Sequence, residues 1–148
     1  MEQNQNQCLL EYIGEVRNKI NLAEEMPIMG VKSKIILKKE YTTGLLGLDG
    51  YSHIIVIGLL NQLHESKQEG LLIRSKNKDV FPDQGIFALR GRRINSISFN
   101  ACKLIDISHG IITVDNLDLI TNTPILDLKP YIPYYDSVET AEIPNWAK

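Results

Sequence analysis

Short segments rich in β-branched residues, separated by turn residues, dominate this sequence and limit what it can fold into. The clearest is residues 54–60, a continuous apolar run typical of a buried central strand. Residues 97–107 and 111–114 flank a three-residue turn that ends in Gly110, which is the spacing of a β-hairpin. No helical pattern is longer than about ten residues, and no long helices alternate with the strands.

Weaker strand signals occupy much of the remaining chain. Strands are expected over residues 8–17, 32–40, 71–74, 85–90, 117–120 and 125–128. Loops are expected over 18–30 and 76–84, turn residues crowd 42–51, and 61–70 fits a short helix or a loop. The total of about eight or nine short strands favours an all-β fold, a small closed or curled β-barrel, over a parallel sheet of the Rossmann type.

A single domain is expected over residues 1–148, because a chain of this length buries about two-thirds of its unfolded surface. Residues 1–7 are polar and are expected to be a frayed terminus. Residues 130–148 contain several prolines and a cluster of tyrosines. They are expected to lack regular structure and to wrap the barrel or reach a partner subunit.

Charge and motif content exclude several classes of protein. The formal net charge of -2 gives no global positive field, so no DNA partner is expected and any RNA contact must be local. Cys8 and Cys102 form no CxxC or Cys/His cluster, and the signatures of serine hydrolases, zinc proteases, P-loop and dinucleotide-binding proteins are absent. The run 54–60 is too short to span a bilayer, and residues 1–7 lack a secretory pattern. A cytoplasmic protein with no membrane partner is expected.

Two segments have the composition of a binding site. Arg90, Arg92 and Arg93 follow an expected strand directly, where arginine can make bidentate contacts with phosphate or carboxylate. Residues 117–133 combine dense turn chemistry with polar side chains that alternate onto one strand face. Among the histidines, His53 begins the apolar run and fits a hydrogen-bonded structural role better than that of a base, whereas His64 and His109 lie in polar turns.

The sequence resembles the TsaA-like (TrmO) family of S-adenosylmethionine-dependent methyltransferases, which are built on a small β-barrel. Four segments carry the resemblance, namely YIGEVR at 12–17, GLDGYSHI at 47–54, GIFALR at 85–90 and TPILDLKPYIP at 123–133. The resemblance implies S-adenosylmethionine as cofactor and a homodimer. In the best-known members the methyl group goes to N6 of threonylcarbamoyladenosine in tRNA.

Positions matching the family's site are implied to form a cofactor site near the barrel rim. They are Pro27, Ile28, Met29, Asn61, Gln62, Arg90, Phe99, Ile120, Thr121, Asn122 and Thr123. Substrate contacts are expected from Arg92, Arg93, Asn95, Lys129 and Tyr131. Catalytic candidates are Arg90 and three alternative bases, His53, Tyr41 and Asp127, and no metal site is expected.

Three of these segments depart from the family pattern. Residues 27–29 read Pro-Ile-Met where the family has Pro-Arg-Gln, and residues 90–98 lack the family's two prolines and final glycine. Thr121 and Asn122 replace Asp-Gly, and asparagine tolerates positive φ better than most residues. Three functions remain open: a tRNA methyltransferase as the leading hypothesis, a methyltransferase for a small metabolite, and a non-catalytic S-adenosylmethionine-binding or sensor protein.

Overall fold

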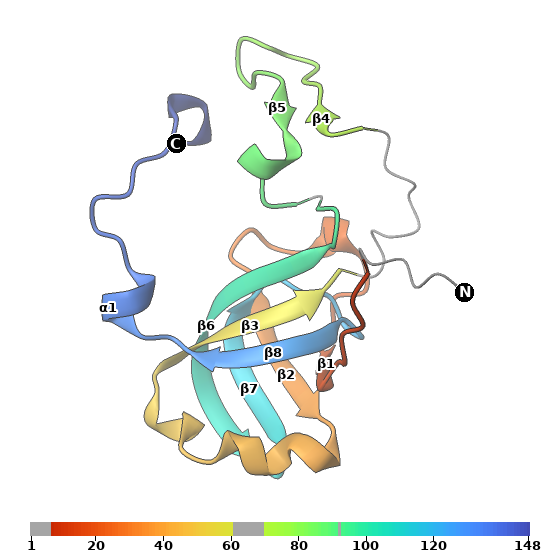
Figure 1. The fold of residues 1–148 in the computed structure, drawn as a ribbon, viewed down its shortest axis with the longest axis vertical. Helices are drawn as coiled ribbons and strands as arrows, with labels where there is room; N and C mark the ends of the chain where they lie inside the picture. The colour runs from red at the N-terminus through yellow and green to blue at the C-terminus, as the bar shows by residue number, and fades with distance from the viewer. Residues whose placement is uncertain (1–6, 61–69, 92) are drawn as a thin grey trace.

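A closed barrel of six antiparallel strands forms the body of the computed structural model, which describes residues 7–60, 70–91 and 93–148 (Figure 1). Around the barrel the strands follow the order β1-β2-β7-β6-β3-β8. Their bounds are β1 (Gly14–Arg17), β2 (Val31–Leu37), β3 (His53–Leu59), β6 (Ile97–Ser108), β7 (Ile111–Leu117) and β8 (Pro124–Pro130). The all-β barrel expected from the sequence is confirmed.

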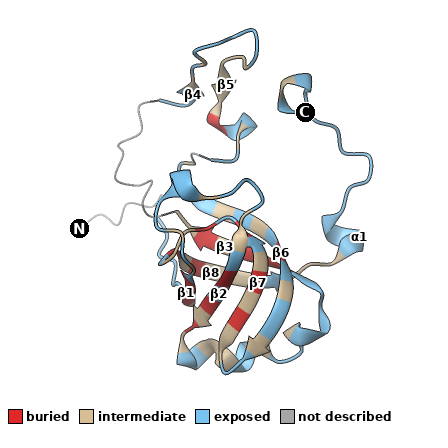
Figure 2. Ribbon diagram, turned by 180° about the vertical axis from the view of Figure 1, so that it is seen from behind, coloured by how far each residue is buried: buried red, intermediate tan, exposed pale blue. Residues whose placement is uncertain are grey.

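Alternating burial along the strands fills the barrel interior. In β2, Ser33 and Ile35 are buried while Lys34 between them is exposed, as the period of two in a strand requires. The apolar run expected to be a central strand is β3, and its Ile54 and Val56 have no exposed surface. Figure 2 shows that the buried residues gather in the barrel strands. One hydrophobic core therefore lies inside the barrel.

The expected hairpin joins β6 to β7. Its turn contains His109 at φ 53° and Gly110 at φ 76°. Positive φ at two successive residues is the conformation that lets a tight turn follow the twist of the two strands. Gly110 also approaches the side chain of Thr42, so the turn packs against residues 39–45, a 3-10 segment that follows β2.

Several expected strands are shorter than the sequence predicted. Residues 8–12 are exposed, and pairing in the first strand begins at Gly14. Leu117 ends β7 instead of beginning a strand over 117–120, because its partner Val31 is the first residue of β2 and no further residue of β2 continues the ladder. The described residues therefore contain eight strands, of which six form the barrel wall.

The segment 85–90 is mainly a 3-10 turn, Ile86–Ala88, instead of the expected strand. Arg93 explains this difference, since its guanidinium donates hydrogen bonds to the carbonyls of Ile86 and Leu89, the latter at 2.8 Å. These hydrogen bonds stabilise the 3-10 turn between Ile86 and Leu89. The short helix or loop expected over 61–70 lies almost entirely outside the described residues, as does most of the frayed terminus expected over 1–7.

Two segments extend outside the barrel wall (Figure 1). One carries the small sheet of β4 (Leu72–Ile73) and β5 (Gln84–Gly85). The other is the C-terminal segment, with the short helix α1 (Pro133–Asp136) and a 3-10 turn, Asn145–Ala147. Phe81 and Trp146 join the two segments through an edge contact, with ring centroids 5.1 Å apart.

Candidate functional site

Five segments distant in sequence meet at one end of the barrel. At this end, called the site end below, β1, β3 and β7 finish and β2, β6 and β8 begin. The loop before β2 is held there by Gly30, because a Cβ on Gly30 would lie 2.6 Å from the backbone carbon of Leu117. The backbone of Gly30 also donates to the carbonyl of Pro27 at 2.8 Å. Residues 27–29 are therefore placed beside the end of β7.

The turn between β7 and β8 is tied to β1 and to the loop that follows it. Asn122 adopts φ 66°, the left-handed conformation that the sequence comparison with Asp-Gly anticipated. Its side-chain oxygen accepts a hydrogen bond from Arg17, and its backbone donates to the carbonyl of Val16 at 2.8 Å. Thr121 donates its backbone N–H to the carbonyl of Ile20 at 2.9 Å, and buried Thr123 bonds the carbonyl of Ile120 through its hydroxyl. The turn 120–123 thus has a fixed shape.

Arg90, Phe99 and Asp118 form a charged and aromatic group at the same end. The Arg90 guanidinium donates to the carbonyl of Phe99 at 3.0 Å and lies 5.9 Å from the centre of the Phe99 ring. Asp118 directly follows β7, and desolvation raises the pKa of its carboxyl from the ordinary value, an effect that the positive charge of Arg90 opposes. Neither a hydrogen bond nor an ion pair engages Asp118 among the described residues. It is an available acceptor beside a guanidinium.

Apolar side chains at the site end are exposed. Ile28 is 98% and Met29 71% exposed, and half the surface of Phe99 is open to solvent. Large apolar side chains in solvent beside a charged group form a surface suited to a ligand that has both apolar and charged parts.

The other residues implied to bind cofactor or substrate near this end add little to the description of the site. Asn61, Gln62 and Arg92 lie outside the described residues. Asn95 is exposed. Arg93 donates hydrogen bonds to two backbone carbonyls and lies 5.6 Å from the Phe87 ring centre. Part of its guanidinium is therefore engaged in stabilising the turn that contains Ile86.

Two of the alternative bases lie away from the site end. Tyr41 and His53 lie at the opposite end of the barrel, called the far end below. There β2 ends, β3 begins and the hairpin joins β6 to β7. The Tyr41 hydroxyl donates to Glu11, and this hydrogen bond, with burial and the nearby carboxylates, raises the pKa of Tyr41 to about 12. His53 is exposed and its ring nitrogen lies 2.9 Å from the hydroxyl of Ser52.

The polar residues of β8 follow the outer wall. Asp127 and Lys129 form an ion pair at 2.6 Å, which raises the pKa of Lys129. Tyr131 contacts His53 edge-on, with ring centroids 6.3 Å apart. Asp127 and Lys129 of β8 and Tyr131 just after it follow one face, as the sequence predicted, but this face leads towards the far end and does not open into the site end.

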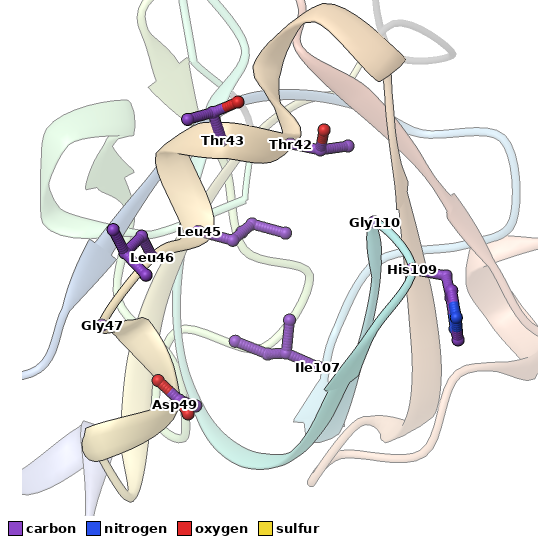
Figure 3. A pocket seen from close by; sticks show the side chains of 9 residues that line it. All are labelled: Thr42, Thr43, Leu45, Leu46, Gly47, Asp49, Ile107, His109 and Gly110. Atoms are coloured by element: carbon purple, nitrogen blue, oxygen red, sulfur yellow. The ribbon is translucent and has the colours of Figure 1, made fainter.

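A separate hollow of about 440 Å³ lies at the far end (Figure 3). Leu45 and Ile107 point into it, whereas the ring of His109 points away. Its lining is Thr42, Thr43, Leu45, Leu46, Gly47, Asp49, Ile107, His109 and Gly110. None of the implied cofactor residues lines this hollow.

Sequence reasoning missed two residues of the site end, Asp118 and Arg17. Asp118 stands between two leucines at a strand end, and a carboxylate flanked by apolar residues is a signal that was available. Arg17 ends the first strand, but its bond to Asn122 joins residues 105 positions apart and left no local pattern. In the described part of the chain, no three His, Cys, Asp or Glu side chains are grouped to hold a metal, and no helix is long and apolar enough to cross a membrane.

Known proteins resemble this chain in sequence and in fold. A "Probable S-adenosyl-L-methionine-binding protein" of Pyrococcus abyssi is 29% identical over 137 residues, covering 88% of this chain and 72% of that protein. The tRNA (adenine(37)-N6)-methyltransferase of Rattus norvegicus is 28% identical over 142 residues, covering 91% of this chain and 31% of the rat protein. The crystal structure of TrmO from Pseudomonas aeruginosa superposes with a TM-score of 0.73 at 25% identity, covering 92% of this chain and 61% of that one.

The chain thus spans less than a third of the rat protein and under two-thirds of the TrmO chain. The family described as tRNA-methyltransferase O N-terminal domain matches residues 18–137, which include five of the six barrel strands, all but β1, and the site-end segments 27–30, 90–99 and 118–123. By this match and by its barrel, the chain belongs to the tRNA-methyltransferase O N-terminal domain family.

Proposed function

We propose that this chain is a methyltransferase that binds S-adenosylmethionine at the site end and methylates N6 of threonylcarbamoyladenosine in tRNA. The observation that supports it best is the group formed by Arg90, Phe99 and Asp118 beside the fixed turn 120–123. These parts come from three separate segments of the chain. The names of the rat and Pyrococcus relatives point to the same cofactor and to a tRNA adenine.

The residues present fit such a cofactor. An aromatic ring attracts a cation, and an ionised carboxylate without a hydrogen-bond partner can accept from an ammonium or from ribose hydroxyls. Phe99 and Asp118 provide these two groups, and exposed Ile28 and Met29 provide apolar surface for the remainder. The shape of the turn 120–123 leaves backbone groups at fixed positions beside them.

Bound there, S-adenosylmethionine supplies an already activated methyl group, so the protein's main task is alignment. Arg90 keeps guanidinium donors beyond the one that bonds Phe99, and these can hold the carboxylate of a threonylcarbamoyl group. That carboxylate can itself accept the proton that leaves N6. A reaction of this kind needs no protein base, which agrees with the positions of Tyr41 and His53 at the far end.

We also propose that the protein acts as a homodimer. Apolar side chains on the outside of β6 and on the C-terminal segment are exposed, including Ile105, Tyr134 and Tyr135. Contiguous apolar surface on a soluble protein is often an interface with another protein. Sedimentation equilibrium is expected to give a mass of about twice 16.8 kDa, and a mass of one chain would contradict this part of the proposal. A tRNA substrate agrees with the cytoplasmic location expected from the sequence.

The test is a titration of the full chain with S-adenosylmethionine and S-adenosylhomocysteine, followed by incubation with labelled cofactor and bulk tRNA. Asp118→Asn should weaken cofactor binding, while the matched change Asp49→Asn beside the far-end hollow should not. Labelled tRNA would support the proposal. Binding with label only in small metabolites would favour the metabolite enzyme, binding without any transfer would favour a sensor, and no binding would overturn all three.

A further inference from the structure

Three basic side chains lie together on the outer face of β1 and β2. Arg17 and Lys34 are directly opposite each other in the β1–β2 ladder. Lys32 lies two residues before Lys34 on the same exposed face of β2. Arg17, Lys32 and Lys34 are called the basic strip below.

This arrangement opposes the stability of the sheet. Like charges directly opposite each other on neighbouring strands are destabilising. Arg17 is partly balanced by an ion pair with Glu15 on its own strand. Lys32 and Lys34 have no ion pair within the part of the chain that the structure describes. On the adjacent β7, Asp115 lies across from Lys32 on one side and from Lys103 on the other. The chain as a whole carries a formal charge of -2, so the strip is a local positive surface on an acidic protein.

The basic strip begins at the rim of the site end. Arg17 bonds Asn122 in the turn 120–123, and Lys32 is two residues beyond Gly30, which holds the loop 27–30 against β7. A register shift between Val31 and Ser33 puts a bulge on the neighbouring β7, where Asp115 and Asn116 together face Lys32 and Asn116 has φ 63°. Bulges turn a side chain away from the regular ladder and are frequent beside functional sites.

We propose that the basic strip binds the phosphate backbone of tRNA and guides the strand to the site end. This inference rests on the proposed function and adds a surface to it. Side chains two residues apart on a strand are about 7 Å apart, so Lys32 and Lys34 offer two ammonium groups in a row along the direction of β2. Lysine suits this role because a phosphate contact needs positive charge and no base-specific geometry.

The experiment measures the affinity of the full chain for bulk tRNA between about 50 and 200 mM salt. The test variant is Lys32→Gln with Lys34→Gln, and the control is Lys39→Gln with Lys148→Gln, two exposed lysines outside the strip. Loss of two phosphate contacts reduces the slope of log affinity against log salt by about 1.4 to 1.8. The drop in affinity over this salt range then becomes roughly ten-fold smaller than for the unmodified protein.

Cofactor titration of the same variants separates the outcomes. A smaller slope in the test variant, with the control and cofactor binding unchanged, would support the basic strip. If the unmodified protein methylates tRNA and the test variant keeps its slope, the strip is refuted while the proposed function stands. If the unmodified protein binds the cofactor but no tRNA, the strip and the tRNA substrate are both refuted, and the cofactor site is retained.

Discussion

Replacing Gly30 by alanine should damage the site end through a contact that only glycine permits. Its φ is +72°, and an added Cβ would lie 2.6 Å from the backbone carbon of Leu117 and 2.8 Å from that of Asn116. Both neighbours are backbone atoms of β7, which cannot rotate away as a side chain can. The loop 27–30 must therefore move, and with it the exposed residues Ile28 and Met29.

The size of the effect can be worked out by comparison with two other glycines. A non-glycine residue at left-handed φ costs about 1–2 kcal/mol. Overpacking adds about 1–3 kcal/mol to the cost. The lower conformational entropy of the unfolded alanine variant offsets about 0.4–1 kcal/mol of this cost. Gly30→Ala should thus cost about 2–4 kcal/mol. Gly47, at φ +86° with no atom near its Cβ position, should cost about 1 kcal/mol. Gly44 has no neighbour and no positive φ, so its replacement should be nearly neutral.

Urea denaturation of the three variants, with the midpoint and slope fitted together, measures these differences. Titration with S-adenosylmethionine should show weaker binding for Gly30→Ala alone, because only this loop is adjacent to the proposed cofactor site. A Gly30→Ala variant whose free energy of unfolding matches that of Gly47→Ala would show that the close approach to β7 is absent, and the argument about the loop would fail.

Three further predictions concern single side chains. The pKa of Asp118 is raised in the folded protein, so the neutral carboxyl stabilises the fold at acid pH, and this contribution is lost as the pH rises through that pKa. Asp118→Asn does not lose it and should therefore gain stability relative to the unmodified protein between acid and neutral pH. Thermal unfolding at several pH values measures the difference. Asn122→Ala should cost about 1 kcal/mol more than Asn122→Gly, since both lose the bond to Arg17 but only alanine is strained at φ 66°. Equal denaturation midpoints for the two variants would contradict the left-handed conformation at residue 122. Tyr41→Phe should leave the rate of methyl transfer unchanged, because a phenol with a pKa of about 12 stays protonated at neutral pH; a loss of about 10²-fold or more would instead identify Tyr41 as a base.

Local pattern predicted the barrel strands well where one face is buried. The run 54–60 and the turn at His109 and Gly110 have signals within a few residues, namely continuous apolar character and a glycine in a tight turn. Strand ends were less predictable, because they depend on where the partner strand stops. Residues 117–120 look like a strand by composition, yet β7 ends when β2 offers no further partner.

The site depended on the resemblance more than on local chemistry. Nothing near residues 27–29 indicates that they lie beside the end of β7, because the contact is made by the backbone of Gly30. The hydrogen bond from Arg17 to Asn122 and the proximity of Arg90 to Asp118 arise only when the barrel closes. Long-range contacts of this kind have no spacing that a single sequence can reveal.

The chain's single tryptophan lies at the junction of two external segments, where Trp146 meets Phe81. Its fluorescence therefore reports on that junction and not on the barrel interior, whose core contains no aromatic side chain among its buried members. Separation of the C-terminal segment from residues 71–90 would change the emission while the sheet stayed intact. Tryptophan emission and far-ultraviolet circular dichroism are therefore expected to follow different transitions, so emission alone would misreport the stability of the barrel.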